Sequence, residues 1–165
     1  MHALRVLLPA AAASLLSASA TAEPPANPMQ FFEGRTVGSG TVRILLEKPY
    51  RTRSVGEGRF ASDGSLLFIQ RVVDDGRPPR QRRWKIRQTG PRSFAGTMSE
   101  AIGPVTIDEL AGRYRFRFRM KGNLSVEQWL VPLAGGATAR NSLTIRKFGV
   151  KVGSGEGMLS KLAGR

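Results

Sequence analysis

The sequence predicts an all-β fold, a single antiparallel up-and-down β-barrel of about eight or nine strands. Turn-forming pairs recur roughly every 8 to 15 residues, a spacing that suits hairpins and leaves no room for crossover helices. These pairs are Lys48-Pro49, Asp63-Gly64, Asp75-Gly76, Gly90-Pro91, Gly103-Pro104, Ala111-Gly112, Gly122-Asn123 and Gly135-Gly136. Apolar and polar residues alternate between them, as in strands with one buried face. Because so many sequential hairpins twist and leave unpaired edges, we expect the sheet to close on itself.

Residues 1–22 are typical of a secretory signal. Arg5 precedes an apolar run over residues 6–16, and small residues lead to Ala22. The run is shorter than the ~20 residues of a membrane-spanning helix, so we expect no transmembrane span in the mature chain. The sequence therefore predicts export to the periplasm or beyond. An uncleaved N-terminal anchor is the alternative, because Arg5 is the only cation of this segment.

The remaining chain has the length of one domain. Residues 23–30 contain three prolines and predict an extended tether. Residues 31–152 are expected to form the barrel. Residues 153–165 are glycine-rich at their start and predict a tail or a short C-terminal helix. The glycines lack the spacing and the βαβ context of a phosphate-binding loop.

The clearest strand is the segment 113–121, in which aromatic or apolar residues alternate with cations. The alternation directs Tyr114, Phe116 and Phe118 toward the core, and burial of each is worth ~1.5 to 3 kcal/mol. A turn at Gly122-Asn123 should pair this strand with residues 124–131. The same period of two appears over residues 42–47 and 82–87, which predict further strands.

The segment 50–60 predicts a strand with an unusually small face. Thr52, Ser54, Gly56 and Gly58 share that face, and charged residues occupy the other. Small inward-facing residues leave volume for a cavity inside a barrel. Glycines in a strand also mark bends at a barrel corner, so both interpretations stay open.

The residues absent from the chain exclude most catalytic chemistry. There is no cysteine, and His2, the single histidine, lies in the segment expected to be removed. These absences exclude catalytic triads, Cys–His pairs and the common zinc sites, and we expect no catalytic residue, metal or cofactor. The carboxylate pairs 74/75 and 108/109 fall at turns. The sequence thus predicts a protein that is not an enzyme, although Glu127 or Lys147 chemistry stays a lesser alternative.

The chain is strongly basic, with 26 Lys and Arg against 12 Asp and Glu and a net charge of +14. Such a surface attracts polyanions. Because export separates the protein from nucleic acid, anionic lipid or polysaccharide is the expected partner. An arginine comb on one strand face is the candidate surface, formed by Arg113, Arg115, Arg117 and Arg119. Genomic codon bias toward arginine is the competing explanation.

Several polar residues fall on apolar strand faces. Arg82 shares a face with Trp84, and Gln128 shares one with Leu130. Buried polar groups need partners, so they are either satisfied within the protein or face a ligand. A large indole can fill a core or line an apolar cavity. The candidate ligand-binding residues are Arg82, Trp84, Gln128, Trp129, Asn141 and Lys147.

Several stretches together resemble a bacterial family of exported proteins known as domain of unknown function family 3833. They are Phe31-Phe32-Glu33-Gly34-Arg35-Thr36 with Gly38 and Gly40, residues 78–84, Gly103-Pro104-Val105-Thr106, residues 120–130 and Arg146-Lys147-Phe148-Gly149-Val150. The resemblance implies a calycin-like, lipocalin-type barrel whose interior can hold an apolar or amphipathic molecule. Some relatives look like lipoproteins, whereas this chain has no cysteine to acylate, and its glycine-rich end differs from the more helical C-terminus that the resemblance implies.

Three classes of function follow from these observations. The leading hypothesis is a non-enzymatic binding protein of the cell envelope that holds a lipid-like or amphipathic small molecule. The alternatives are a basic surface adaptor that binds anionic lipid or polysaccharide, and a structural protein of unknown role.

Overall fold

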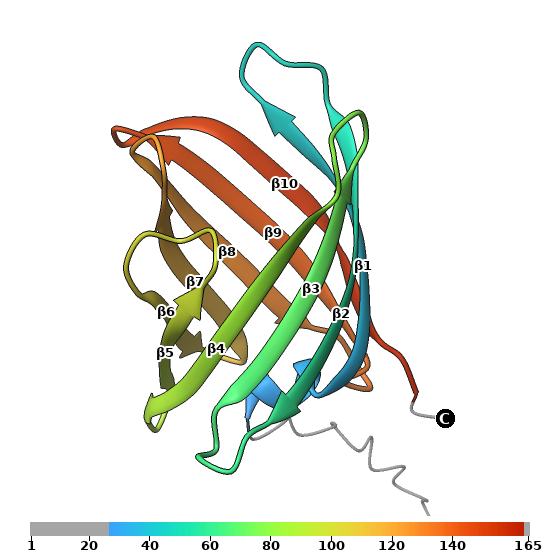
Figure 1. The fold of residues 1–165 in the computed structure, drawn as a ribbon, viewed down its shortest axis with the longest axis vertical. Helices are drawn as coiled ribbons and strands as arrows, with labels where there is room; N and C mark the ends of the chain where they lie inside the picture. Colours follow the sequence, from blue (N-terminus) through green and yellow to red (C-terminus); the bar gives the residue numbers. More distant parts are fainter. Residues whose placement is uncertain (1–26, 164–165) are drawn as a thin grey trace, which may run out of the picture.

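The computed structural model describes residues 27–163. A 3-10 helix, η1 (Pro28–Phe32), precedes ten strands (Figure 1). The strands are β1 (Gly34–Ile44), β2 (Tyr50–Phe60), β3 (Leu66–Asp74), β4 (Arg80–Gly90), β5 (Ser93–Met98), β6 (Val105–Leu110), β7 (Arg113–Met120), β8 (Leu124–Pro132), β9 (Thr138–Lys147) and β10 (Val150–Lys161). The predicted signal segment and residues 23–26 of the predicted tether lie outside the described residues.

The strands form one closed antiparallel barrel, which confirms the predicted fold class. Each strand pairs with the next along the chain, and β10 returns to pair with β1, where Lys161 lies opposite Thr36. Every turn pair predicted from the sequence lies at a connection between consecutive strands. One further turn, Phe148–Gly149, joins β9 to β10 and carried no recognised turn signal. The barrel therefore has ten strands where eight or nine were expected.

The prediction of a glycine-rich tail or short helix over residues 153–165 is wrong for residues 153–161, which belong to β10. Residues 164–165 lie outside the described part of the chain. Gly153, Gly155 and Gly157 face the interior side of the barrel wall. A Cβ on Gly157 would overlap the backbone oxygen of Ser39, and one on Gly155 would lie 3.0 Å from Leu143 Cγ. Glycine here lets β10 approach its neighbours, although its low strand propensity hides the strand in the sequence.

The domain begins earlier than expected, because η1 replaces the end of the predicted tether. The Asn27 side chain caps η1 by accepting a hydrogen bond of 2.8 Å from the Met29 amide. Met29 and Phe31 are buried. The Phe32 ring packs against Phe68, with centroids 5.2 Å apart. The helix therefore closes one end of the barrel and serves as its floor (Figure 1).

The small face of β2 has two different roles along its length. Near the floor, a Cβ on Gly56 would overlap the Phe68 ring and one on Gly58 would overlap the Phe32 carbonyl, so these glycines make room for the core. Farther from the floor, Thr52 and Ser54 border open space inside the barrel. Both interpretations of the small residues therefore apply, each to one half of the strand.

The alternation in β7 gives the expected buried face, since Tyr114, Phe116 and Phe118 are all buried. The alternation over residues 42–47 extends less far than predicted. Strand β1 ends at Ile44, and Leu46 adopts a left-handed backbone with φ of 67° in the loop that follows.

The turn between β2 and β3 supports a pH-dependent prediction. Asp63 accepts hydrogen bonds from the Ser65 hydroxyl at 2.5 Å and the Ser65 amide at 3.0 Å. These two bonds, in that order, and then Lys85 lower the pKa of Asp63 from 3.8 to about 2. A depressed carboxyl pKa stabilises the fold above the unfolded-state pKa, and we expect that contribution to disappear as the pH falls through this window.

An NMR titration of the Asp63 carboxyl carbon measures this pKa directly. We expect Ser65→Ala to raise it more than Lys85→Met does, because the Ser65 bonds are the larger cause. A wild-type value at the ordinary level for aspartate would contradict the prediction.

Candidate functional site

The barrel interior contains a cavity of about 180 Å³. Its walls come from β1 to β4 and from β7 to β10, together with Phe32 above the floor. It extends toward the mouth end, which we define as the end opposite η1, where the β1–β2, β3–β4, β5–β6, β7–β8 and β9–β10 connections lie (Figure 1). An apolar protein cavity of ~150 Å³ can hold benzene, so this space suits one ring or a short chain.

Apolar side chains line much of the cavity. Their inward direction follows from the period of two in each strand. The apolar lining residues include Leu66, Phe68, Val72, Ile86, Phe116, Leu130, Leu143, Ile145 and Leu159. The same face of each strand thus supplies both the core and the wall of the cavity.

Three ion pairs among four side chains lie toward the mouth end of the cavity. Arg80 Nη1 donates to Asp74 Oδ2 at 2.5 Å, and the Asp74 side chain is only 1% exposed. Arg82 Nε donates to Glu100 Oε2 at 2.7 Å, and Glu100 Oε1 lies 3.2 Å from Arg80 Nε. Two guanidinium groups thus face two carboxylates, so the cluster is electrically balanced.

Three buried polar atoms on cavity-lining residues lack a hydrogen-bond partner within the described residues. They are Asp74 Oδ1, Trp84 Nε1 and Arg80 Nε, whose 3.2 Å approach to Glu100 Oε1 is an ion pair without hydrogen-bond geometry. The Trp84 ring is held edge-to-face against Phe118, with centroids 6.1 Å apart. A bound molecule that donates to Asp74 and accepts from Trp84 would satisfy both atoms, and a hydroxyl group can do each.

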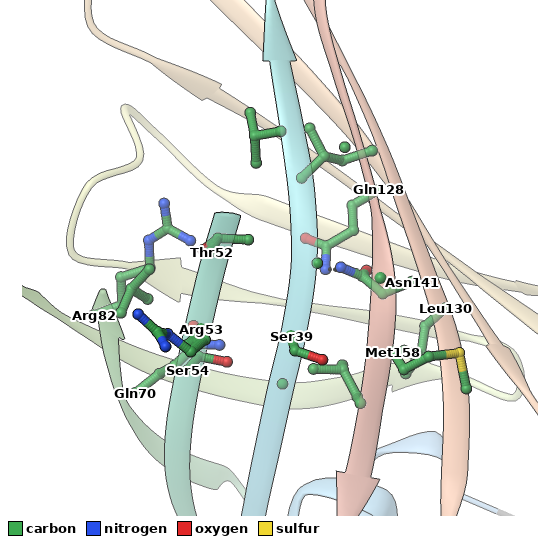
Figure 2. Close-up of a pocket in the computed structure, with 18 of the residues that line it drawn as sticks. Ser39, Thr52, Arg53, Ser54, Gln70, Arg82, Gln128, Leu130, Asn141 and Met158 are labelled. Atoms are coloured by element: carbon green, nitrogen blue, oxygen red, sulfur yellow. Dashed lines mark hydrogen bonds between the residues drawn. The ribbon is translucent and has the colours of Figure 1, made fainter. Parts of the chain in front are cut away.

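An amide pair occupies the other side of the cavity. Gln128 Nε2 donates to Asn141 Oδ1 at 2.7 Å. Figure 2 shows these two side chains meeting, while Arg82 and Gln70 lie on the opposite side near Thr52 and Ser54. Each amide carries a second polar atom that this bond does not use. The cavity therefore presents polar groups on two sides and apolar surface between them.

The structure separates the six ligand-binding candidates into two groups. Arg82, Trp84, Gln128 and Asn141 line the cavity, and their role in ligand binding stays a prediction. Trp129 and Lys147 do not line this cavity, and any part they have in ligand binding also stays a prediction.

Trp129 and Lys147 lie outside the cavity for different reasons. Trp129 is one residue out of phase with Gln128 and lies on the outer wall, where its Nε1 donates to Glu127 Oε1 at 3.2 Å. Lys147 ends β9 and is exposed beside the Phe148–Gly149 turn.

The charged part of the site, Asp74 and Glu100, was not predicted from the sequence. Asp74 was assigned to a turn, but it shares the inward phase of Phe68, Gln70 and Val72 at the end of β3. The alternation of inward-facing and outward-facing residues along β3 was therefore the sequence signal that could have identified Asp74. Glu100 follows β5 in a loop, so no periodicity could have placed it beside Arg82.

The arginine comb lies on the outer face of β7, where it was expected. Arg115 and Arg117 Nη2 atoms lie 3.4 and 2.8 Å from Asp108 Oδ2. The guanidinium groups of Arg113 and Arg115 lie 5.2 and 5.7 Å from the Trp129 ring centroid. The comb is therefore partly neutralised and stacked within the protein, and its binding of anions stays a prediction.

A small clasp joins two loops at the mouth end. Arg77 Nη2 pairs with Glu47 Oε2 at 2.5 Å, and the Arg77 guanidinium lies 4.2 Å from the Tyr50 ring centroid. Burial is the main cause of a raised pKa for Tyr50, opposed by the charge of Arg77. The clasp connects the β1–β2 loop to the β3–β4 loop beside the cavity.

Within residues 27–163, no three His, Cys, Asp or Glu side chains form a group that could hold a metal ion. Over the same residues, no helix has the length and apolar character needed to cross a membrane.

Two solved structures share this fold at low sequence identity. An S-type phycobiliprotein lyase from Guillardia theta matches with a TM-score of 0.66 at 7% identity, covering 83% of this chain and 92% of that one. A protein of unknown function from the DUF3598 family of Nostoc punctiforme matches with a TM-score of 0.58 at 12% identity. That match covers 84% of this chain and 50% of the Nostoc protein. At these identities the likeness concerns the fold alone.

No curated protein matches the chain. A family model does match it, over residues 5–161, and the description of that family is "Protein of unknown function (DUF3833)". The match covers nearly the whole chain, including all ten strands. The chain therefore belongs to the DUF3833 family.

Proposed function

We propose that the protein is a non-enzymatic binding protein of the cell envelope, whose barrel holds a lipid-like or other amphipathic small molecule. One observation carries the proposal: an interior cavity combines apolar walls with the unpartnered buried atoms Asp74 Oδ1 and Trp84 Nε1. Ligand cavities in proteins typically have this composition, with a few convergent polar groups in apolar surroundings.

The unpartnered atoms favour a ligand because they are costly otherwise. A buried polar atom without a hydrogen bond costs about 1 to 3 kcal/mol. A ligand hydroxyl or amide beside either atom would remove that cost there, because its hydrogen can be donated to Asp74 Oδ1 and its oxygen can accept from Trp84 Nε1. Its apolar part would contact Leu66, Phe68 and Phe116, at about 25 cal/mol for each Å² removed from water.

The charge balance of the site favours a neutral polar group on the ligand. Arg80 and Arg82 are already paired with Asp74 and Glu100. A ligand carboxylate would have to compete with those carboxylates for the guanidinium groups and would add an uncompensated buried charge, which is costly. A neutral donor and acceptor avoids that cost.

Two further parts of the proposal rest on the sequence. Placement in the envelope follows from the signal-like residues 1–22, and cell fractionation tests it. A binding rather than catalytic role follows from the lack of cysteine and of any histidine beyond His2. The carboxylates of Asp74 and Glu100 are engaged in ion pairs, which suits a structural role for them.

The direct experiment is solvent extraction and mass spectrometry of the purified protein. We expect a co-purified molecule that has an apolar body and an uncharged polar group. Recovery of no such molecule, together with failure of all the probes described next, would overturn the proposal.

Titration with 1-octanol tests the cavity with a defined probe that has one apolar chain and one hydroxyl. Trp129→Phe leaves Trp84 as the only tryptophan, so its fluorescence reports the interior. We expect Ser54→Leu to weaken octanol binding by about tenfold or more, equivalent to about 1.4 kcal/mol, because the added side chain fills the space.

Ser125→Leu is the matched control, since Ser125 is exposed on the outer face of β8. It should leave the octanol affinity unchanged. Octanoate should bind more weakly than octanol to the wild type. Equal effects of the two serine variants would place the probe outside the barrel.

A further inference from the structure

The loops of the mouth end carry exposed apolar side chains. Leu46 in the β1–β2 loop is 98% exposed, and Phe148 in the β9–β10 turn is 76% exposed. Leu45 and Val150 beside them are also exposed, as is Ile102 in the β5–β6 loop. Figure 1 shows the β1–β2 and β9–β10 hairpins at the end opposite η1.

The backbone at these positions disfavours the residues found there. Leu46 has a φ of 67° and Phe148 a φ of 49°, in the left-handed region that favours glycine and asparagine. In the β7–β8 turn at the same end, the residue with a left-handed backbone is Asn123, at a φ of 57°, and asparagine is a residue type that tolerates this conformation. Leu46 and Phe148 are therefore unfavourable in two ways. They expose large apolar side chains to water, and they adopt a backbone conformation that disfavours such residues. Such local conflicts are expected at functional positions.

Lysines gather at the same end of the barrel. Four of the six lysines of the chain lie in or beside its connections, namely Lys48, Lys121, Lys147 and Lys151. None of these four forms an ion pair among residues 27–163. The acidic groups of the neighbouring loops, Glu47 and Asp75, are paired with arginines.

The apolar tips and the lysines are interleaved. Phe148 and Val150 lie between Lys147 and Lys151, and Leu45 and Leu46 lie close to Lys48 along the chain. The two hairpins are linked, because the Leu45 amide donates to the Val152 carbonyl at 2.8 Å. Apolar side chains at separate loop tips, each flanked by ammonium groups, suit a surface whose anionic headgroups cover an apolar interior.

We propose that the mouth end docks on an anionic phospholipid bilayer, with Leu46 and Phe148 inserted at the level of the acyl chains and the four lysines against the headgroups. This surface is separate from the arginine comb of β7, and the proposal does not depend on the ligand of the cavity. Docking in this orientation places the end of the barrel toward which the cavity extends against the membrane. The exposure of Leu46 and Phe148 to water is then relieved, because their side chains enter the apolar layer on binding, and this gain offsets the cost of their backbone conformation.

Vesicle flotation of the full chain tests the docking. Vesicles of phosphatidylglycerol and phosphatidylethanolamine should bind the wild type, and pure phosphatidylcholine vesicles should bind it more weakly. Leu46→Asn combined with Phe148→Asn should lower binding to the anionic vesicles at least tenfold. This variant should fold as well as the wild type, because asparagine tolerates the left-handed backbone.

Separate variants test the role of the lysine charges and the location of the docking surface. Replacement of all four mouth lysines by glutamine should remove the preference for anionic vesicles and the sensitivity to salt. Replacement of Arg113 by glutamine is the control on the comb and should change little, because Arg113 begins β7 at the floor end of the barrel. Val55→Asn is the apolar control, because Val55 is exposed on the barrel wall and not at a tip.

The depth to which the loop tips insert into the bilayer can be measured by fluorescence quenching at position 148, and residues 1–22 do not affect this measurement. In the Trp129→Phe background, Phe148→Trp should be quenched by lipids with brominated acyl chains, whereas Val55→Trp should not. Absence of quenching at position 148, or wild-type flotation of the Leu46→Asn, Phe148→Asn variant, would overturn the proposal. A dimer in sedimentation that this variant dissociates, without vesicle binding, would also overturn it in favour of self-association. Octanol binding should be unaffected by the tip variants, so this test and that of the cavity fail separately.

Discussion

Phe116→Lys is expected to abolish folding. The Phe116 side chain is 4% exposed, faces Ile107 and Gln128 across its two strand pairs, and packs against Phe32 of the floor. The substitution removes a ring worth about 3 to 5 kcal/mol in such positions. It also places an ammonium group within the hydrophobic core cluster. The free energy of unfolding of a domain is only about 5 to 15 kcal/mol. Loss of the ring and burial of the charge together should therefore leave little or no stability.

Circular dichroism and thermal unfolding measure the outcome, with Ile69→Lys as the control. Ile69 lies on the outer face of β3, half exposed, with Glu57 opposite it on β2. The same charge there should change stability by less than about 1 kcal/mol. A folded Phe116→Lys protein with a cooperative transition would show that water reaches the interior at this level.

Arg80→Met is the second change with a large expected effect. It leaves the Asp74 carboxylate, whose side chain is 1% exposed, without its ion-pair partner. Loss of one partner of a buried pair costs about 3 to 5 kcal/mol, and we expect about 2 to 4 kcal/mol because Arg80 itself reaches solvent. Urea unfolding at neutral pH measures the difference.

The double variant Arg80→Met, Asp74→Asn distinguishes the effect of an unpaired buried charge from the effect of losing the Arg80 side chain. Since no charge is then left unpaired, it should recover at least half of the lost stability. Equal destabilisation of the single and double variants would show that packing of the Arg80 stem, and not the ion pair, is what matters. Arg53→Met is the control, because its pair with Asp75 is exposed on both sides and should contribute little.

The barrel could be predicted because its signals are local. Each turn pair such as Gly122-Asn123 acts within a few residues, and the alternation in β7 needs only its own segment. Strand β10 escaped prediction because Gly153, Gly155 and Gly157 occupy most of its inward face and carry no apolar side chain, so Leu159 alone cannot reveal a period. What makes β10 a strand is its pairing with β1 and β9, and that information is distributed over the whole chain.

The candidate site was predictable to the extent that it follows strand phase. Gln128 and Asn141 face inward because they share a phase with buried Leu130 and Ala139, and the amides then meet across neighbouring strands. The indole of Trp129 makes it a candidate ligand-binding residue by its chemistry, but its strand phase directs it outward. The structure follows the phase and places Trp129 on the outer wall. Glu100 reaches Arg82 from a loop, where no periodicity exists.

The pairing of β1 with β10 makes closure of the barrel a late event. The first strand finds its second partner only in the last one, after nearly the entire domain has been synthesised. Contacts so distant along the chain form slowly. While translation proceeds, the nascent polypeptide therefore lacks the finished hydrogen-bond ring, and β1 keeps one edge without a strand partner. An unpaired strand edge can pair with another chain, so the unfinished sheet is most exposed to aggregation before the last strand is made.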